Sequence, residues 1–439
     1  MPAHRIGTGA RLTRRAMLRD TALAGFGIWT LSRHAGGAQI PSPNERLSIA
    51  CIGVGGRGAH NLADCSGEQI VALCDVDQRR AAAAGQKFPQ ARHYRDFRKM
   101  LDEMDREIDA VVVSTPDHIH APAAVLAMKM GKHCYCEKPL AHTVAEVRMM
   151  TELARRKGLA TQMGTQIHAG ANYRRVVELV QSGAIGPVAE VHVWHPVRYE
   201  GGGRPTDTPP APAELDWDLW LGPAPVRPYH PCYVPGAWRG WWDFGNGGLG
   251  DFGCHYMDLP FWALRLRHPS TIEAEGPRVH PERTSSGLIV RYEFPARDAL
   301  PAVRMTWYDG GRRPDFLSDR KIPEWGAAVL FIGSKGMLIA DYDRHRLLPE
   351  DQFAGFQRPD PTIPDSIGHH AEWIRACKTG APTTCNFDYS GALAETVLLG
   401  NAAHRVGKKL RWDPARLEAA GCPEADAFLH KAYRKGWEL

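Results

Sequence analysis

The chain has 439 residues, of which 44% are hydrophobic and 23% are charged, a length and composition typical of a globular protein with two domains. Its formal net charge of +5 lies entirely in residues 1–38, which hold six arginines and one aspartate. The remainder is neutral overall, so charge gives no reason to expect a nucleic-acid partner or binding to an anionic membrane surface.

The basic segment, residues 1–38, has the three parts of an export signal. Arg14 and Arg15 form a twin-arginine pattern, residues 22–31 are a short apolar stretch, and the small residues at 35–38 suit a cleavage site. The apolar stretch is far shorter than the ~20 residues that a spanning helix requires. We therefore expect twin-arginine export to the periplasm or another extracytoplasmic compartment, with no membrane segment in the mature form. The alternative is a basic terminus without a targeting role.

The rhythm of apolar runs predicts two domains of an α/β protein. Residues 47–165 alternate short strand-like runs with helix-like segments, which predicts an N-terminal Rossmann domain with a doubly wound parallel sheet. After about residue 185, strand-like runs follow one another without long helices between them. Residues 166–439 are therefore expected to form a C-terminal α+β domain that has a largely antiparallel sheet and binds the substrate.

A glycine-rich turn follows the first predicted strand, in the place where a dinucleotide fingerprint has physical meaning. Glycines there allow a tight turn and a close approach of the backbone to a pyrophosphate, which rests on the N-terminus of the next helix. The residues of this turn expected to contact the cofactor are Gly53, Gly55, Gly56, Arg57 and Gly58.

The choice between NAD and NADP depends on the end of the second predicted strand. Asp75 lies there, 22 residues beyond Gly53, where its carboxylate can accept a hydrogen bond from a ribose 2′-hydroxyl. That position favours NAD. Arg79 and Arg80 follow closely, and arginine suits a 2′-phosphate, so NADP stays as the alternative.

Two further motifs lie at the carboxyl ends of later strands, the edge where open α/β sheets bind ligands. Thr115, Pro116 and His120 follow the third strand and are expected to form a wall for the nicotinamide half, although an ordinary strand-to-helix loop would look the same. Glu137 and Lys138 end the fourth strand and are also expected beside the cofactor. Because lysine can polarise a hydroxyl or carbonyl group, Lys138 indicates hydride chemistry at this position.

These motifs, taken in this order, resemble the glucose–fructose oxidoreductase/inositol dehydrogenase (Gfo/Idh/MocA) family. The resemblance extends to residues 247–258, 331–336 and 434–439 and covers nearly all of the region after the export signal. It implies an NAD(P)-dependent enzyme in which a lysine and an Asp-x-x-x-His pair carry catalysis.

The family roles map onto Lys138, Asp251 and His255. If residues 250–258 begin a helix, Asp251 and His255 are neighbours on one face. His255 can remove a hydroxyl proton because the ordinary pKa of histidine is near neutrality. Lys138 would stabilise the developing alkoxide, and Asp251 would orient the imidazole or the sugar.

Candidate substrate contacts lie at the junction between the two domains and in a tryptophan-rich segment. Polar groups at the junction can bind sugar hydroxyls or can hold the domains together, and Trp217 can serve as scaffold or as pocket wall. The candidates are Gln166, His168, Asn172, Arg174 and Trp217. No metal site is predicted, because Cys134 and Cys136 are spaced too tightly for the common zinc pairs.

The leading hypothesis is an exported NAD(P)-dependent oxidoreductase that acts on a hydroxyl of a sugar or cyclic polyol. A redox-assisted glycosidase with a tightly bound, recycled cofactor is the alternative, since an exported location has no obvious pool of free NAD. A noncatalytic sugar-binding protein is the third hypothesis, against which the intact lysine, aspartate and histidine argue. The resemblance also suggests a homo-oligomer.

Overall fold

The computed structural model describes residues 46–199 and 203–439. The predicted export signal lies outside these residues. Among the described helices, none is both long and apolar enough to cross a membrane.

The first domain is built on a six-stranded parallel sheet with the strand order β3-β2-β1-β4-β5-β6. Its strands are β1 Ser48–Ile52, β2 Gln69–Cys74, β3 Arg92–Tyr94, β4 Ala110–Val113, β5 His133–Glu137 and β6 Thr161–Gly164. Its helices are α2 Arg57–Asp64, α3 Gln78–Lys87, α4 Phe97–Glu103, α5 Asp117–Lys129 and α6 Val144–Lys157. The strand order reverses between β1 and β4, and the carboxyl ends of strands beside such a reversal leave a crevice for a ligand. The predicted Rossmann fold is confirmed.

The second domain is built on a nine-stranded sheet with the order β13-β12-β11-β7-β10-β9-β8-β14-β15. Its strands are β7 Val188–Trp194, β8 Thr271–Glu275, β9 Ile289–Phe294, β10 Val303–Tyr308, β11 Ala328–Gly333, β12 Gly336–Ala340, β13 His345–Leu348, β14 Leu410–Asp413 and β15 Glu418–Ala419. Strands β7 and β10 are parallel, and the other neighbouring pairs are antiparallel. The predicted, largely antiparallel sheet is therefore also confirmed.

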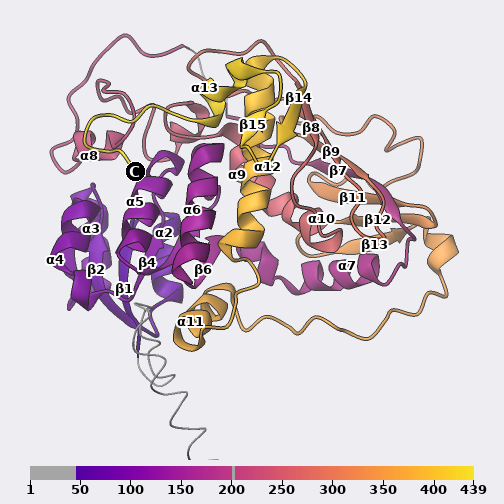
Figure 1. The fold of residues 1–439 in the computed structure, drawn as a ribbon, viewed down its shortest axis with the longest axis horizontal. Coiled ribbons are helices and arrows are strands. Elements are labelled where there is room, and N and C mark those ends of the chain that lie inside the picture. Colours follow the sequence, from indigo (N-terminus) through magenta and orange to yellow (C-terminus); the bar gives the residue numbers. More distant parts are fainter. Residues whose placement is uncertain (1–45, 200–202) are drawn as a thin grey trace, which may run out of the picture. The chain divides into compact units, whose positions relative to one another are not determined.

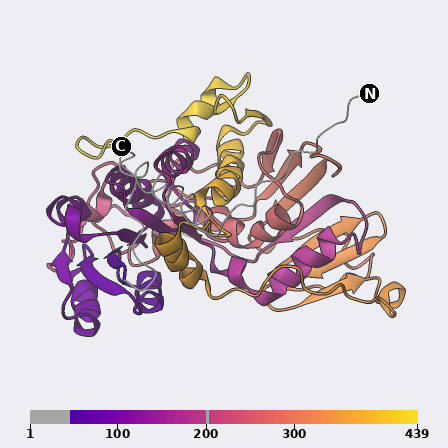
Figure 2. The same cartoon turned by 60° about the horizontal axis from the view of Figure 1, so that its bottom comes forward.

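The remaining helices connect the sheets and cover the second one. They are α7 Ala171–Gln181, α8 Trp217–Leu221, α9 Gly247–Tyr256, α10 Asp258–Ala263, α11 His369–Thr379, α12 Phe387–Val406 and α13 Asp426–Leu429. Both ribbon views place the Rossmann domain on the left, the second sheet on the right and α12 between them (Figures 1 and 2).

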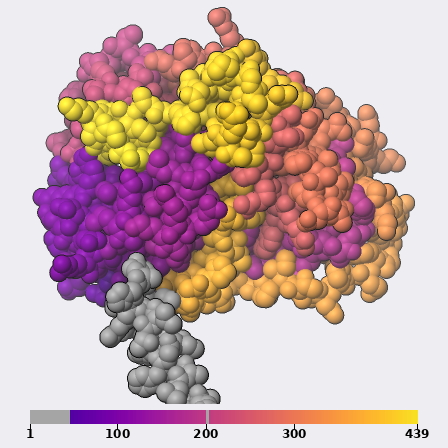
Figure 3. Space-filling model, in the orientation of Figure 1, coloured from indigo at the N-terminus to yellow at the C-terminus, as the bar shows by residue number. Residues whose placement is uncertain are grey.

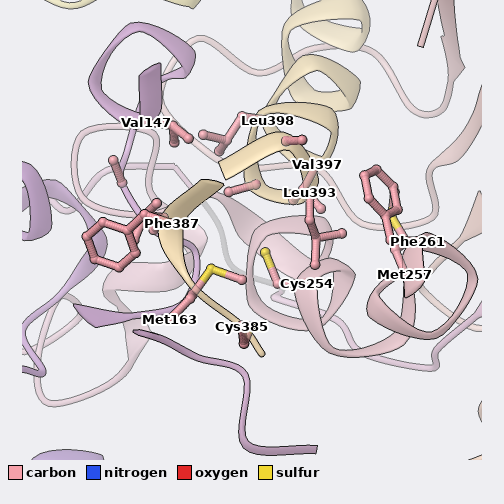
Figure 4. Close-up of a cluster of buried hydrophobic side chains, with 14 of the residues drawn as sticks. Val147, Met163, Cys254, Met257, Phe261, Cys385, Phe387, Leu393, Val397 and Leu398 are labelled. Carbon is pink, nitrogen blue, oxygen red and sulfur yellow. The ribbon is translucent and has the colours of Figure 1, made fainter. Parts of the chain in front are cut away.

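Helix α12 holds the two domains together. Asn386 caps its N-terminus by accepting a hydrogen bond from the Tyr389 amide, and Gly407 ends it with a positive φ of 70°. The helix contacts α6 of the first domain and α9 and β8 of the second, so its apolar residues are buried on several faces. Figure 4 shows Val147 and Met163 beside the α12 side chains. Each Leu or Phe buried in this way contributes about 1.5–3 kcal/mol relative to exposure, so the domains share one core.

A buried histidine makes the stability of this domain contact sensitive to pH. In the neutral tautomer that fits its contacts, the Nε2–H of His369 donates to the carbonyl oxygen of Met163 at 2.8 Å, and its Nδ1 accepts from the Gln162 side chain at 3.3 Å. Burial lowers the pKa of His369 from 6.5 to about 4. Protonation of Nδ1 would also remove the acceptor that Gln162 uses.

We expect the free energy of unfolding to fall as the pH is lowered from 6.5 towards 4, because the unfolded chain then binds a proton that folded His369 refuses. His369→Gln should remove up to about 3 kcal/mol of that loss, as follows from 1.36 kcal/mol per pKa unit. Urea unfolding at a series of pH values measures it. The exposed His430→Gln is the control and should keep the wild-type slope; an unchanged slope in His369→Gln would contradict this assignment.

Candidate active site

A cavity of about 1440 Å³ lies at the carboxyl ends of the Rossmann strands. It is larger than the roughly 300–1,000 Å³ of pockets for drug-sized ligands, so it has room for a dinucleotide and a small substrate together. The predicted residues that line it are Gly53, Gly55, Gly56, Arg57, Asp75, Thr115, Pro116, Glu137, Lys138, Gln166 and His255. Residues predicted separately as cofactor and catalytic contacts thus share one cleft.

The glycine turn has the close packing that the fingerprint requires. A Cβ atom at Gly58 would lie 1.9 Å from the carbonyl oxygen of Gly53, and one at Gly53 would lie 2.7 Å from that of Ser114. Helix α2 begins directly after Gly56, whose φ is 53° and beside which a Cβ would meet open space. The N-terminus of α2 therefore opens on the cleft with free amide groups, which suits a pyrophosphate.

Asp75 is held in place for a ribose. Its two carboxylate oxygens accept from the amides of Val54 at 3.0 Å and Asp77 at 2.9 Å, and burial raises its pKa. Each oxygen keeps a second lone pair for a ribose hydroxyl, so the residue fits NAD. Arg80 passes over the turn, since a Cβ at Gly55 would lie 2.4 Å from its Cδ. Arg79 is instead tied to the Asp77 carboxylate at 2.8 Å.

Lys138 meets Asp251 across the domain boundary. Its Nζ donates to the main-chain carbonyl oxygen of Asp251 at 2.6 Å and to the carboxylate of the same residue. Asp251 lies on α9, as predicted, and His255 lies one turn further along the same helix. Burial alone would raise the pKa of Asp251, but the positive charges of Lys138 and Arg239 hold it well below its ordinary range. The aspartate is therefore ionised and fixed.

His255 is the candidate proton acceptor. Burial, and then the positive charge of Lys138, lower its pKa well below its ordinary value, so its imidazole is neutral. Its Nδ1 is buried and has no hydrogen-bond partner among the described residues. A neutral imidazole beside an ammonium group has a nitrogen lone pair ready for a proton, and that is the property a general base needs.

Glu137 and His120 connect the loops of the site. The Glu137 carboxylate accepts from the side chains of Asn61 and Gln166, each at 2.8 Å, and from Arg57 at 3.3 Å. The two ring nitrogens of His120 lie 2.8 Å from the carbonyl oxygens of Pro139 and Thr115. His120 is almost fully buried and is absent from the cavity lining given by the described residues, so it orders the cofactor loops from behind.

Three predicted substrate contacts are corrected by the structure. His168 is buried with its Nδ1 2.9 Å from the Asp258 carboxylate, Arg174 binds Glu372 at 2.9 Å, and Asn172 donates to the Asp341 carbonyl oxygen at 2.9 Å. In the part of the chain that the structure describes, none of the three lines the cavity. Polar groups buried at a domain junction need partners there, and these residues have found them within the protein.

Trp217 is likewise scaffold. Its indole N–H donates to the Arg227 carbonyl oxygen at 2.7 Å, and its ring stacks on Trp220 with the centroids 4.7 Å apart. Trp220, and not Trp217, is the one of the pair that lines the cavity. The tryptophan-rich segment therefore reaches the cleft through a different ring from the predicted one.

Three residues of the site were missed from the sequence. The Tyr199 hydroxyl donates to the Asp251 carboxylate, and the Arg239 Nε lies 3.2 Å from it. Asp117 lines the cavity and accepts from Asn246 at 3.1 Å, and burial raises its pKa to about 6. Asp117 directly follows Pro116 at the ligand-binding edge, which was a usable signal; Tyr199 and Arg239 lie in irregular segments that carry no such signal.

Gly58→Ala should weaken dinucleotide binding by at least about tenfold, since the added methyl group would collide with the Gly53 carbonyl oxygen and deform the turn. NADH fluorescence titration measures the dissociation constant. Gly67→Ala is the matched control, because a Cβ there meets nothing within 4 Å. Equal affinity of Gly58→Ala and wild type would show that this turn does not hold the nucleotide.

Family models match almost the whole described chain. Residues 47–165 match the oxidoreductase family model for the NAD-binding Rossmann fold, and residues 169–439 match the model for its C-terminal alpha/beta domain. The solved structure of GenD2 from gentamicin A biosynthesis, in complex with NAD, has a similar fold, with a TM-score of 0.57, 19% identity and coverage of 86% of this chain and 99% of that one.

Curated relatives match over part of their length. An inositol 2-dehydrogenase of Salmonella typhimurium is 30% identical over 155 residues, which are 34% of this chain and 46% of the relative. A glycosyl hydrolase family 109 protein of Shewanella sp. is 31% identical over 168 residues, 35% of this chain and 36% of the relative. The chain thus matches less than half the length of either relative. The two family models together show that the chain carries an NAD-binding Rossmann domain and belongs to the Gfo/Idh/MocA oxidoreductase family.

Proposed function

We propose that the protein is an exported NAD-dependent oxidoreductase that oxidises a hydroxyl group of a sugar or cyclic polyol. The observation that carries the proposal is the contact between Lys138 and Asp251, with His255 on the same helix, in the cleft that also contains the glycine turn. Family membership and the similarity to an inositol dehydrogenase support the substrate class. Export rests on the twin-arginine pattern, and self-association stays a prediction to be measured by sedimentation.

The proposed roles follow from the charge states. Bound NAD supplies the chemistry of the redox step by accepting hydride from the carbinol carbon. Neutral His255 accepts the proton of the substrate hydroxyl, and the Lys138 ammonium group stabilises the negative charge that develops on the oxygen. Ionised Asp251, held by Tyr199 and Arg239, keeps the ammonium group in position.

A redox-assisted glycosidase is the second candidate, and the glycosyl hydrolase family 109 relative favours it. In this reaction one carbinol carbon of the sugar is oxidised to a ketone, and the neighbouring carbon loses its acidified proton. The aglycone then leaves and takes up a proton, water adds to the unsaturated sugar, and the hydride is restored to the ketone. The net change is hydrolysis. Asp117, with a pKa of about 6, supplies a carboxyl group that exchanges a proton near neutral pH in the cleft.

Two assays on the purified protein distinguish the candidates. In the first, a panel of sugars and cyclic polyols is supplied with NAD, and NADH formation is followed by absorbance. In the second, 4-nitrophenyl glycosides are supplied without added nucleotide. Oxidation only with added NAD supports the oxidoreductase and excludes the glycosidase. Release of nitrophenol without added NAD supports the glycosidase, and inactivity in both assays would overturn both.

Lys138→Ala should lower kcat/KM by a factor of about 10² or more, as loss of a preorganised electrostatic group does elsewhere, while the dissociation constant for NADH changes little. Lys132→Ala is the matched control, because Lys132 is similarly buried and pairs with Asp105 at 2.9 Å at the opposite end of β5. The control should keep wild-type turnover. If Lys138→Ala lost NADH binding together with activity, its role would be structural.

A further inference from the structure

The cleft has a second wall that comes from outside the Rossmann domain. Residues of the segment 212–239 line the same cavity as Asp75, as does Trp437 near the C-terminus. The apolar and aromatic residues of this segment that face the cavity are Pro212, Leu215, Leu219, Trp220, Tyr229 and Trp238. In Figure 1, α8 and the C-terminus lie beside each other above the Rossmann domain.

The segment is attached to the loop that would hold the ribose. Leu215 pairs with Asp77 in an antiparallel bridge. The Gln78 amide donates to the Glu214 carbonyl oxygen at 3.0 Å, and the Asp216 amide donates to that of Val76 at 2.9 Å. Since the Asp77 amide donates to the Asp75 carboxylate, the wall is fixed within two residues of the predicted ribose contact.

The same segment is attached again on the other side of the strand-order reversal. The His118 Nε2 lies 3.0 Å from the Trp220 carbonyl oxygen, and the His118 amide donates to that of Phe244 at 3.3 Å. His118 opens α5, directly after the loop predicted to contact the nicotinamide half. The segment therefore crosses from the end of β2 to the end of β4 and is held at both.

The C-terminal residues close the wall from above. The Arg434 guanidinium donates to the Gly222 carbonyl oxygen at 2.9 Å and pairs with the Asp218 carboxylate on α8. Trp437 is buried, with its ring centroid 6.0 Å from that of Phe97 and 3.9 Å from the Arg98 guanidinium. Figure 3 shows the C-terminal residues lying across the boundary between the Rossmann domain and the residues around α8.

We propose that residues 212–239 and Trp437 enclose the adenosine half of the cleft, so that NAD stays bound between turnovers as a resident group. The inference rests on the proposed function and deepens it. Release of the nucleotide would require the bridge at Asp77 or the contacts of Trp437 to open, because these contacts join the wall to the residues that hold the ribose. A resident cofactor has to be restored in place, so the hydride taken from one substrate passes to a second carbonyl compound or returns to the same substrate.

The dissociation rate of NADH tests this proposal. The full-length protein is loaded with NADH, passed through gel filtration and mixed with a large excess of NAD, and the loss of bound-NADH fluorescence is followed. The wild type should retain NADH through gel filtration and release it slowly. Trp437→Ala, and Arg434→Ala, which loosens the wall without lining the cavity, should each release NADH at least about tenfold faster.

Arg344→Ala is the matched control. Like Arg434, Arg344 pairs with an aspartate, Asp341 at 2.8 Å, and lies beside a tryptophan, Trp325 at 4.1 Å, but far from the cleft in sequence and absent from its lining among the described residues. It should release NADH at the wild-type rate, and thermal unfolding confirms that all three variants are folded. Rapid exchange in the wild type, or equal rates in all variants, would overturn the proposal.

The outcome separates this inference from the proposed function. If NADH exchanges rapidly but sugars or polyols are oxidised with added NAD, the enclosing wall is wrong and the oxidoreductase stands. If NADH is retained and released faster by the Trp437 and Arg434 variants while no sugar or polyol reacts, the wall stands and the function is wrong.

Discussion

The active cleft depends on one ion pair between the domains. Lys138 ends a strand of the first domain and Asp251 lies on a helix of the second, and their side chains are only 13% and 12% exposed. Removing two charges from water is costly unless each has further partners. Tyr199 and Arg239 supply those partners for the carboxylate, and the Asp251 carbonyl oxygen supplies one for the ammonium group. Because α12 packs against both domains, it keeps the two ends of this pair at a fixed distance.

The pair also sets the charge of the proton acceptor. An ammonium group held beside a buried imidazole makes a second positive charge unfavourable, which is why the pKa of His255 falls. The same ammonium group favours negative charge on a substrate oxygen. One fixed cation therefore promotes loss of the hydroxyl proton twice, by keeping the base free and by stabilising the alkoxide. Asp251 is too strongly ionised to compete for that proton.

The sequence was informative wherever function depends on a local pattern. Gly53, Gly58 and Asp75 are fixed by the turn and strand that contain them, and Asp251 and His255 by the period of one helix. The errors concern residues whose role depends on distant partners. His168 and Arg174 look like free polar groups at a junction, but Asp258 and Glu372, some 90 and 200 positions away, take up their hydrogen bonds.

The misjudged tryptophan leads to the same physical lesson. The segment around Trp217 is irregular because it follows the surface of another domain, and its backbone partners are the residues next to Asp75. No periodic pattern in a sequence reports such pairing. Its consequence is chemical: a wall fixed to the ribose loop separates the reaction from free exchange of nucleotide. The oxidoreductase and the glycosidase share their first step, so the fate of the hydride decides between them. A cleft that retains its cofactor favours reactions in which oxidation is followed by reduction in the same site.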